Sequence, residues 1–161
     1  MRKGRLSVLL AVAGMLVAML TLAGTALALL SETPDDTPGV DGRVRAIEQV
    51  GTNVWVGGNF SKVTNPDGTV FNVRNVAVFD SVKNRYVNIA PKLGTSTSEV
   101  WAMARYGKKI LIAGKFAGPT STQKNLVLVD GRNGDVIRWY NSPSLRSVLA
   151  APRLGRVYGG G

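Results

Sequence analysis

The chain repeats itself, and this internal repeat limits the possible folds more than any other feature of the sequence. A segment that begins at Val44 matches one that begins at Val100, 56 residues later, and a third copy begins at Val148. Residues 75–80 match residues 125–130 at an offset of 50, so the difference falls in a loop, where insertions are tolerated. The first match rests on Val44/Val100, Ala46/Ala102, Gly51/Gly107, Val54/Ile110, Gly58/Gly114 and Phe60/Phe116.

Each full copy predicts four short strands, because apolar, β-branched runs alternate with clusters of Gly, Asn, Pro and Asp. The runs at residues 54–56 and 126–129 do not alternate with polar residues, so we expect these strands to be buried on both faces. Asn133 and Gly134 predict a two-residue hairpin turn with positive φ angles. The predicted strands are residues 43–50, 53–60, 74–80 and 85–89 in the first copy, and 99–106, 109–116, 125–130 and 135–140 in the second.

Four-stranded units at this period, apolar on both faces, are typical of β-propeller blades. The Gly-Gly-x-Phe element at residues 57–60 and the Asn-(apolar)4-Asp element at residues 75–80 resemble the delta-sixty type, kelch-like propeller repeats of exported bacterial proteins. Ala113 replaces the first glycine of the doublet in copy two, and copy three lacks the valine before Gly159. The resemblance implies a propeller fold and export, and it implies no particular activity.

The expected fold class is therefore all-β, a partial β-propeller behind an N-terminal signal helix. It comprises two four-stranded antiparallel blades, at residues 43–98 and 99–147, and the start of a third at residues 148–161. Propellers close with about four to eight blades, whereas this sequence contains two and part of a third. We therefore expect the chain to be a fragment of a propeller, with blade faces left uncovered. The side chains expected on those faces are Val54, Val56, Leu126 and Leu128.

Residues 1–28 have the three parts of a secretory signal: basic residues at the start, an apolar run, and Ala26-Leu27-Ala28 before a cleavage point. An uncleaved membrane anchor is the alternative, because about 20 apolar residues span a bilayer. Residues 29–42 form an acidic linker rich in Pro and Gly. We therefore expect a secreted or cell-envelope protein, with a membrane-anchored form as the alternative.

Composition excludes several classes of function. The chain has no cysteine and no histidine, which rules out disulfides, Cys-ligated zinc and His-dependent triads. Residues 43–161 contain 17 basic and six acidic residues, a net charge of +11. This surplus predicts attraction to an anionic cell-envelope polymer or to lipid head groups, and its alternative is a soluble, positively charged surface. Another protein is a further candidate partner, and a membrane is expected only if the leader is uncleaved. Nucleic acid is not expected as a partner, because no aromatic residues interleave with the basic ones.

No catalytic, cofactor-binding or metal-binding residues are predicted. The glycines at residues 57–58 precede a Phe and another strand, so close backbone packing is favoured over a phosphate loop. Asp80 and Asp130 recur at equivalent strand ends, as turn-capping residues do, and the spacing of Asp130 to Asp135 does not fit a calcium loop. No pair among the acids suggests glycoside hydrolysis. Trp55, Trp101 and Trp139 fall inside predicted strands, which indicates core positions.

The longest predicted connections share one rim of the blades, and long loops on a rigid scaffold concentrate binding. These connections are residues 61–73, 90–98, 117–124 and 141–147. Their basic residues are opposed by one acid, Asp67. The opposite rim is also basic, so loop length decides the choice. The function expected is a non-catalytic, envelope-associated binding or scaffold module; the alternative is the propeller part of a longer secreted enzyme, for example a carbohydrate-active one. The candidate partner-binding residues are Lys62, Lys92, Lys124 and Arg146.

Export with cleavage after Ala28 gives the first testable prediction. The mature protein should begin at Leu29, because the small-residue site ends there. Mass spectrometry of the secreted and membrane fractions measures the N-terminus. An intact segment of residues 1–28 in the membrane fraction would instead identify the anchor.

Overall fold

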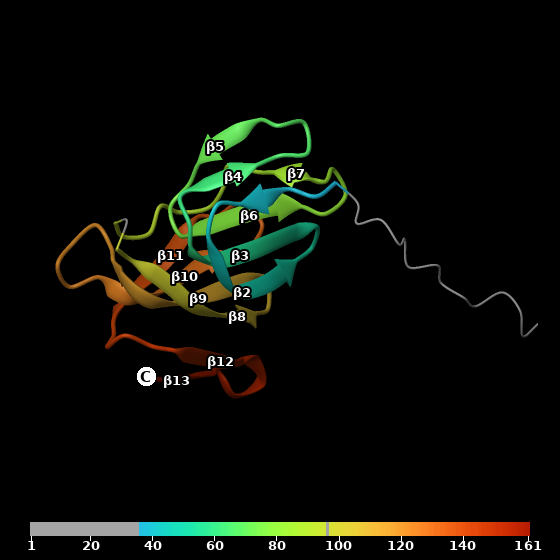
Figure 1. Cartoon of the computed structure of the whole chain (residues 1–161). Coiled ribbons are helices and arrows are strands. Elements are labelled where there is room, and N and C mark those ends of the chain that lie inside the picture. Colours follow the sequence, from blue (N-terminus) through green and yellow to red (C-terminus); the bar gives the residue numbers. More distant parts are fainter. Residues whose placement is uncertain (1–35, 96) are drawn as a thin grey trace, which may run out of the picture. The chain divides into compact units, whose positions relative to one another are not determined.

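In the computed structural model, residues 36–95 and 97–161 are described, and they form an all-β unit of four small antiparallel sheets (Figure 1). The predicted signal segment, residues 1–28, and the first part of the linker lie outside these residues. Within the described part of the chain, no helix has the length and apolar character needed to cross a membrane.

The two full copies of the repeat form two four-stranded sheets, which we call the first and second meanders. Strands are hydrogen-bonded in the order β2-β3-β6-β7 in the first meander and β8-β9-β10-β11 in the second. All eight lie within or close to the predicted segments, and these assignments are confirmed. The bounds are β2 (Arg43–Val50), β3 (Asn53–Asn59), β6 (Val76–Asp80), β7 (Arg85–Tyr86), β8 (Glu99–Tyr106), β9 (Lys109–Ala117), β10 (Lys124–Asp130) and β11 (Val136–Asn141).

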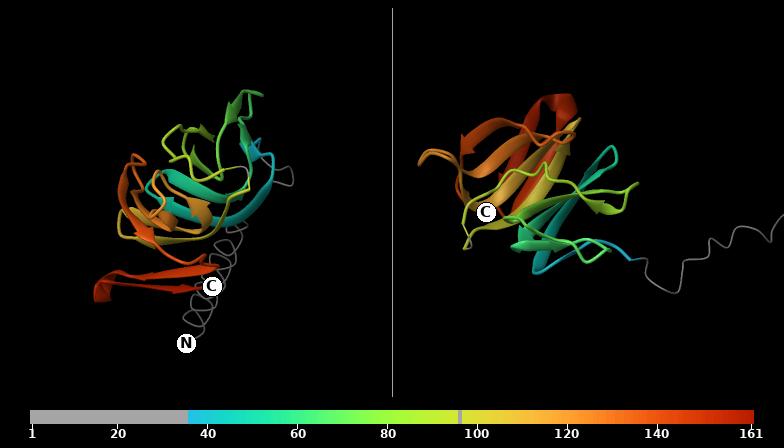
Figure 2. Two further views of the ribbon diagram at one scale, coloured as in Figure 1. Left: turned by 90° about the vertical axis from the view of Figure 1, so that its left-hand side faces the viewer. Right: turned by 90° about the horizontal axis from the view of Figure 1, so that it is seen from above.

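The third copy forms a two-stranded hairpin of β12 (Ser147–Ala151) and β13 (Arg156–Gly160), with the short helix η1 (Pro152–Leu154) between them. β12 lies against β8, and β8 lies against β2. The first strands of the three copies are therefore neighbours, and the copies follow one another as successive layers (Figure 2).

The main core lies between the two meanders. Trp55 of β3 is fully buried there and donates its indole N–H to the carbonyl of Gly131 in the second meander, at 2.9 Å. Gly57 has no side chain because an added Cβ would collide with Val100 and Met103 of β8. This contact confirms the prediction that the glycine serves close packing. Each meander thus buries a face that would be apolar and exposed on its own.

A fourth sheet covers the other face of the first meander. It contains β1 (Gly39–Val40), β4 (Lys62–Thr64) and β5 (Val70–Asn72) in the order β1-β4-β5. Val63 of β4 is fully buried against Val56, Phe60 and Ala77. We call this the cover sheet.

The structure corrects three predictions about loops and exposed faces. Residues 61–73 are not a strandless loop, because β4 and β5 pair within them, and the end of the linker contributes β1. Val54 and Val56 are not bare: Val54 is half-buried and Val56 is 6% exposed. Leu126 and Leu128 are half-buried, and Leu128 shares a small cavity with Val157 of β13.

The hairpin turn between β10 and β11 also differs from its prediction. The loop has four residues rather than two, and it is closed by the hydrogen bond from the Asp130 amide to the Asp135 carbonyl. Gly134 alone has a positive φ, +79°. In the first meander Asn84, with φ of +49°, takes the equivalent place. One left-handed residue at the end of each four-residue loop is enough to reverse the chain. The two consecutive positive φ angles of a two-residue turn are therefore absent.

Asn75 and Asn125 lie at the start of the third strand of each meander. They tie it to the connection that follows the fourth strand. Both have positive φ angles, +62° and +67°, and both are buried. The Asn75 amide group donates to the carbonyls of Leu93 and Thr95, and that of Asn125 donates to the carbonyl of Ser142. Asparagine fits because it tolerates the left-handed conformation and supplies a donor.

Substitution of Asn75 should separate these two contributions. Asn75→Gly removes the side-chain hydrogen bonds alone, whereas Asn75→Ala also strains the backbone, which costs roughly 1–2 kcal/mol at a left-handed residue. The free energy of unfolding in urea should therefore fall further for Asn75→Ala, by about that amount. Equal values for the two variants would contradict this assignment.

Candidate functional site

The connections predicted to share one rim are tied together by hydrogen bonds. The Asn59 side chain donates to the carbonyl of Ser98 at 3.1 Å, and Asn75 reaches the same connection. Asn125 ties the start of β10 to the connection between β11 and β12. The connections of each meander therefore meet at one rim, as the sequence predicts. Asp67 departs from this prediction, because it lies in a separate hollow with Lys83 and Arg85.

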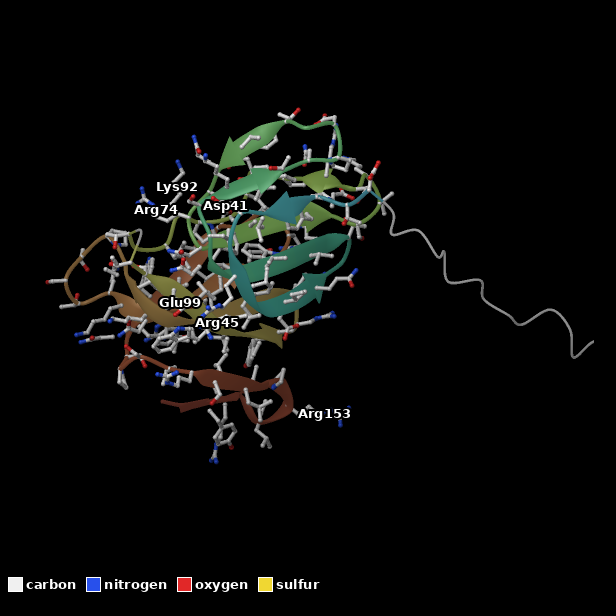
Figure 3. All side chains as sticks on the ribbon, viewed as in Figure 1. Asp41, Arg45, Arg74, Lys92, Glu99 and Arg153 are labelled. Atoms are coloured by element: carbon white, nitrogen blue, oxygen red, sulfur yellow. The ribbon has the colours of Figure 1, made fainter. Side chains whose placement is uncertain are left out.

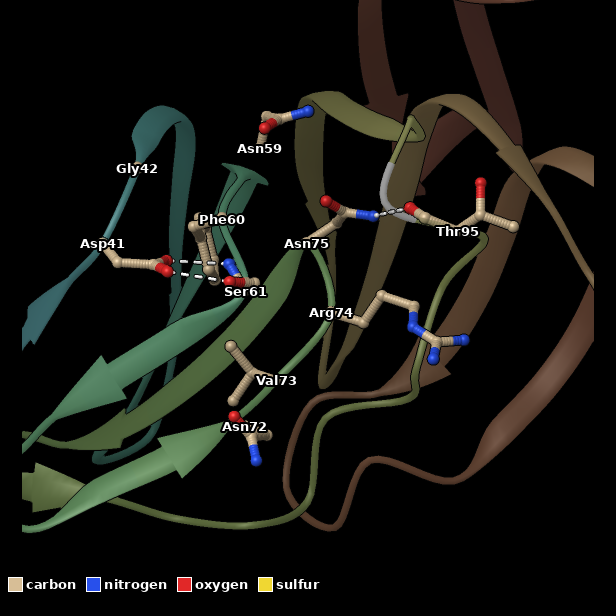
Figure 4. A pocket seen from close by; sticks show the side chains of 10 residues that line it. All are labelled: Asp41, Gly42, Asn59, Phe60, Ser61, Asn72, Val73, Arg74, Asn75 and Thr95. Atoms are coloured by element: carbon tan, nitrogen blue, oxygen red, sulfur yellow. Dashed lines mark hydrogen bonds between the residues drawn. The ribbon is translucent and has the colours of Figure 1, made fainter.

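A cavity of about 690 Å³ opens at this rim beside the first meander (Figure 4). Its one carboxylate, Asp41, accepts hydrogen bonds from the Ser61 amide and hydroxyl and from the Lys62 amide. Slight burial works to raise the pKa of Asp41, but these hydrogen bonds outweigh it and hold the pKa below its ordinary value. The cavity is lined by Asp41, Gly42, Asn59, Phe60, Ser61, Asn72, Val73, Arg74, Asn75 and Thr95.

The cavity also presents a cation. Arg74 is exposed and donates one N–H to the carbonyl of Gly94 at 3.0 Å, which fixes the direction of its guanidinium group. Figure 3 shows Arg74 and Lys92 at the same edge of the first meander. Asp41 is engaged by Ser61 and Lys62, whereas Arg74 is an exposed cation at this cavity.

The four predicted partner-binding residues are all exposed. Lys62 lies on β4, Lys92 in the connection before β8, and Lys124 at the start of β10. None of the three ion pairs found in residues 36–95 and 97–161 includes any of the four. Arg146 differs from the lysines, because its guanidinium group lies over the Trp101 ring, 4.8 Å from the centroid.

Arg146 belongs to a second cavity, of about 340 Å³, that the sequence did not predict. Trp101 is half-buried at this cavity rather than in the core, so its predicted core position is wrong. Trp55 is in the core as predicted, and Trp139 packs at its edge. The cavity is lined by Arg43, Val44, Arg45, Trp101 and Arg146.

Glu99 lies beside Arg45, a residue that lines the second cavity (Figure 3), and it is held by two partners. It accepts a hydrogen bond from the Trp101 indole at 2.6 Å and pairs with Arg45 at 2.5 Å. The Trp101 hydrogen bond, followed by the Arg45 interactions, lowers the pKa of Glu99 against the opposing effect of slight burial. The carboxylate is therefore ionised and engaged, and three arginines, Arg43, Arg45 and Arg146, line the cavity beside it.

The turn aspartates behave as predicted. Asp80 accepts from the amides of Val82 and Lys83, and Asp130 accepts from the Arg132 amide. The Arg132 side chain also binds Asp130 at 2.7 Å, which with the amide lowers the pKa of Asp130 to about 2. Within the described ranges, no three His, Cys, Asp or Glu residues gather as metal ligands would.

Comparison with known proteins adds no relative: no protein-family model matches the chain, and no curated sequence matches it significantly. The resemblance to delta-sixty propeller repeats therefore remains a sequence-based prediction. Functional inference depends on the two cavities and the charges around them.

The Asp130 turn gives a prediction about pH. Because the pKa of Asp130 is about 2 in the folded protein and 3.8 ordinarily, the turn stabilises the fold above pH 3.8 and loses this effect as pH falls towards 2. Arg132→Gln should raise the pKa of Asp130 towards 3.8, measured by NMR titration of the carboxyl carbon. An unchanged pKa in this variant would exclude Arg132 as the main cause.

Proposed function

We propose that the two meanders and the β12–β13 hairpin are blades of a β-propeller. The equal strand order of the meanders supports this, as does the contact of the first strands β2, β8 and β12, which would line the axis of a ring. The cover sheet lies over β3 and β6 and leaves Ile47 of β2, on the same face, 62% exposed. A further blade would have to pack beside the cover sheet on this face.

The function we propose for this module is non-catalytic binding of an anionic polymer of the cell envelope. One observation carries it: on the rim where the long connections meet, the carboxylates of Asp41 and Glu99 are engaged within the protein, while the cations are exposed. The net charge of +11 over residues 43–161 adds long-range attraction. The exposed cations of this rim include Lys62, Arg74, Lys92, Lys124 and Arg146.

The proposal depends on the leader for its location. A protein delivered outside the membrane meets envelope polymers, so the expected export and the expected partner agree. The secreted enzyme remains the alternative function, and no observation in the described residues favours it.

A pull-down with purified bacterial cell wall tests the proposal. Lys62→Glu/Lys124→Glu should lower the fraction of protein retained at low salt, because two attractive charges become repulsive. Retention of the parent should fall as salt rises, since the screening length shortens to roughly 3 Å at 1 M.

The matched control is Lys83→Glu/Lys108→Glu, which makes the same change of charge on the opposite rim. It should retain more protein than the first variant. Equal retention of the parent and the Lys62→Glu/Lys124→Glu variant, or retention independent of salt, would count against this rim.

A further inference from the structure

Two β-bulges lie at the same place in the two meanders. Between β2 and β3, Val44 pairs with Gly58 and Ala46 pairs with Gly57, which leaves Arg45 as an extra residue. Between β8 and β9, Val100 pairs with Gly114 and Ala102 pairs with Ala113, which leaves Trp101 extra. The extra residue is in both cases the middle residue of the repeated Val-x-Ala sequence.

The strands approach closely at both bulges, and a glycine permits this. A Cβ added to Gly58 would collide with the Arg43 carbonyl, and one added to Gly114 would collide with the Glu99 carbonyl. A bulge redirects the side chain of its extra residue, and bulges are frequent next to binding sites. The same β-bulge in two copies therefore directs two chemically different side chains, Arg45 and Trp101, to one cavity.

These side chains are held in place before any ligand arrives. One Glu99 carboxylate binds both of them, Arg45 through its Nε and Trp101 through its indole N–H. The face of the Trp101 ring in turn supports the Arg146 guanidinium group at 4.8 Å, within the range of a cation–π contact. Glu99 is thus a positioning residue for the cluster. We call Arg43, Arg45, Glu99, Trp101 and Arg146 the bulge cluster.

The cluster retains hydrogen-bond donors that face the cavity. Arg45 binds Glu99 through Nε alone, and no hydrogen bond within the described part of the chain engages its two terminal nitrogens. Arg43 and Arg146 make no side-chain hydrogen bond to described residues, and three positive charges meet one negative charge. A guanidinium group has a planar pair of donors that matches two oxygens of a carboxylate or phosphate.

We propose that the bulge cluster binds single oxyanion groups, phosphate or carboxylate, along the anionic polymer, with Arg45 and Arg146 as the contacting residues. This inference rests on the proposed function and locates its specific contact. The lysines Lys62, Lys92 and Lys124 supply diffuse attraction, whereas the arginines of the cluster recognise the group itself. In the third copy the middle residue is Leu149, without a bulge and 64% exposed, so the cluster is confined to the first two copies and Arg146.

The test is titration calorimetry of the full chain with two short probes, an oligomer of glycerol phosphate and an oligomer of galacturonate. Arg45→Lys keeps the charge and removes the planar donor pair, so the affinity should fall about tenfold, the effect of losing a charged hydrogen bond. Trp101→Leu, which introduces the residue of the third copy, should also weaken binding because Arg146 loses its support. Arg153→Lys is the matched control, since Arg153 lies away from the cluster at the β12–β13 hairpin (Figure 3).

The probe that binds identifies the oxyanion, phosphate or carboxylate, and binding of either supports the proposal. Unchanged affinity in Arg45→Lys, or no binding of either probe by the parent, overturns it. Lys62→Glu/Lys124→Glu separates this proposal from the general one, because it should reduce retention on cell wall yet change the affinity for short probes by a smaller factor than Arg45→Lys. Circular dichroism of each variant checks that the fold is kept, and Arg45→Gln provides a second removal of the donor pair if Arg45→Lys unfolds.

Discussion

Trp55 joins the two meanders through the faces that each would otherwise expose to water. Its ring is fully buried, and its indole N–H satisfies the Gly131 carbonyl, which also accepts from Asn53. Removing a buried tryptophan side chain typically costs about 3–5 kcal/mol, a large part of the stability of a small domain. The interface also fixes where β8 lies against β2. Because Arg45 is on β2 and Glu99 is on β8, the bulge cluster exists only while this packing is intact.

The repeat made the strands predictable because strand pairing in a meander is local. Matching glycines and apolar runs located all eight strands of the two meanders, and the recurrence of Asp80 and Asp130 identified their role in turns. The cover sheet was not predictable in the same way. Its strands β4 and β5 are short, occur in one copy alone, and gain their stability from burial of Val63 under the first meander, a contact distant in sequence. Local pattern does not reveal such a contact.

The residues of the second cavity were also predictable only in part. Arg146 was found from its place on a long connection, but its partner Trp101 was assigned to the core because it lies within a strand. A regular strand alternates its side chains between two faces, and the bulge breaks this alternation at Trp101 and Arg45. In the first two copies the valine of Val-x-Ala pairs with a glycine at the bulge, but the third copy has the same pairing and no bulge. The sequence motif alone therefore does not predict the bulges.

The geometry of the repeat separates residues that hold the backbone from residues whose side chains leave the sheet. Asn75 and Asn125 need a left-handed conformation, and Gly58 and Gly114 need the absence of a side chain, so few other residue types fit there. The middle residue of Val-x-Ala has no such requirement, since its side chain leaves the sheet. Arg, Trp and Leu occupy this position in the three copies. The residue at this position can therefore change in one copy at a time without disturbing the core around Trp55.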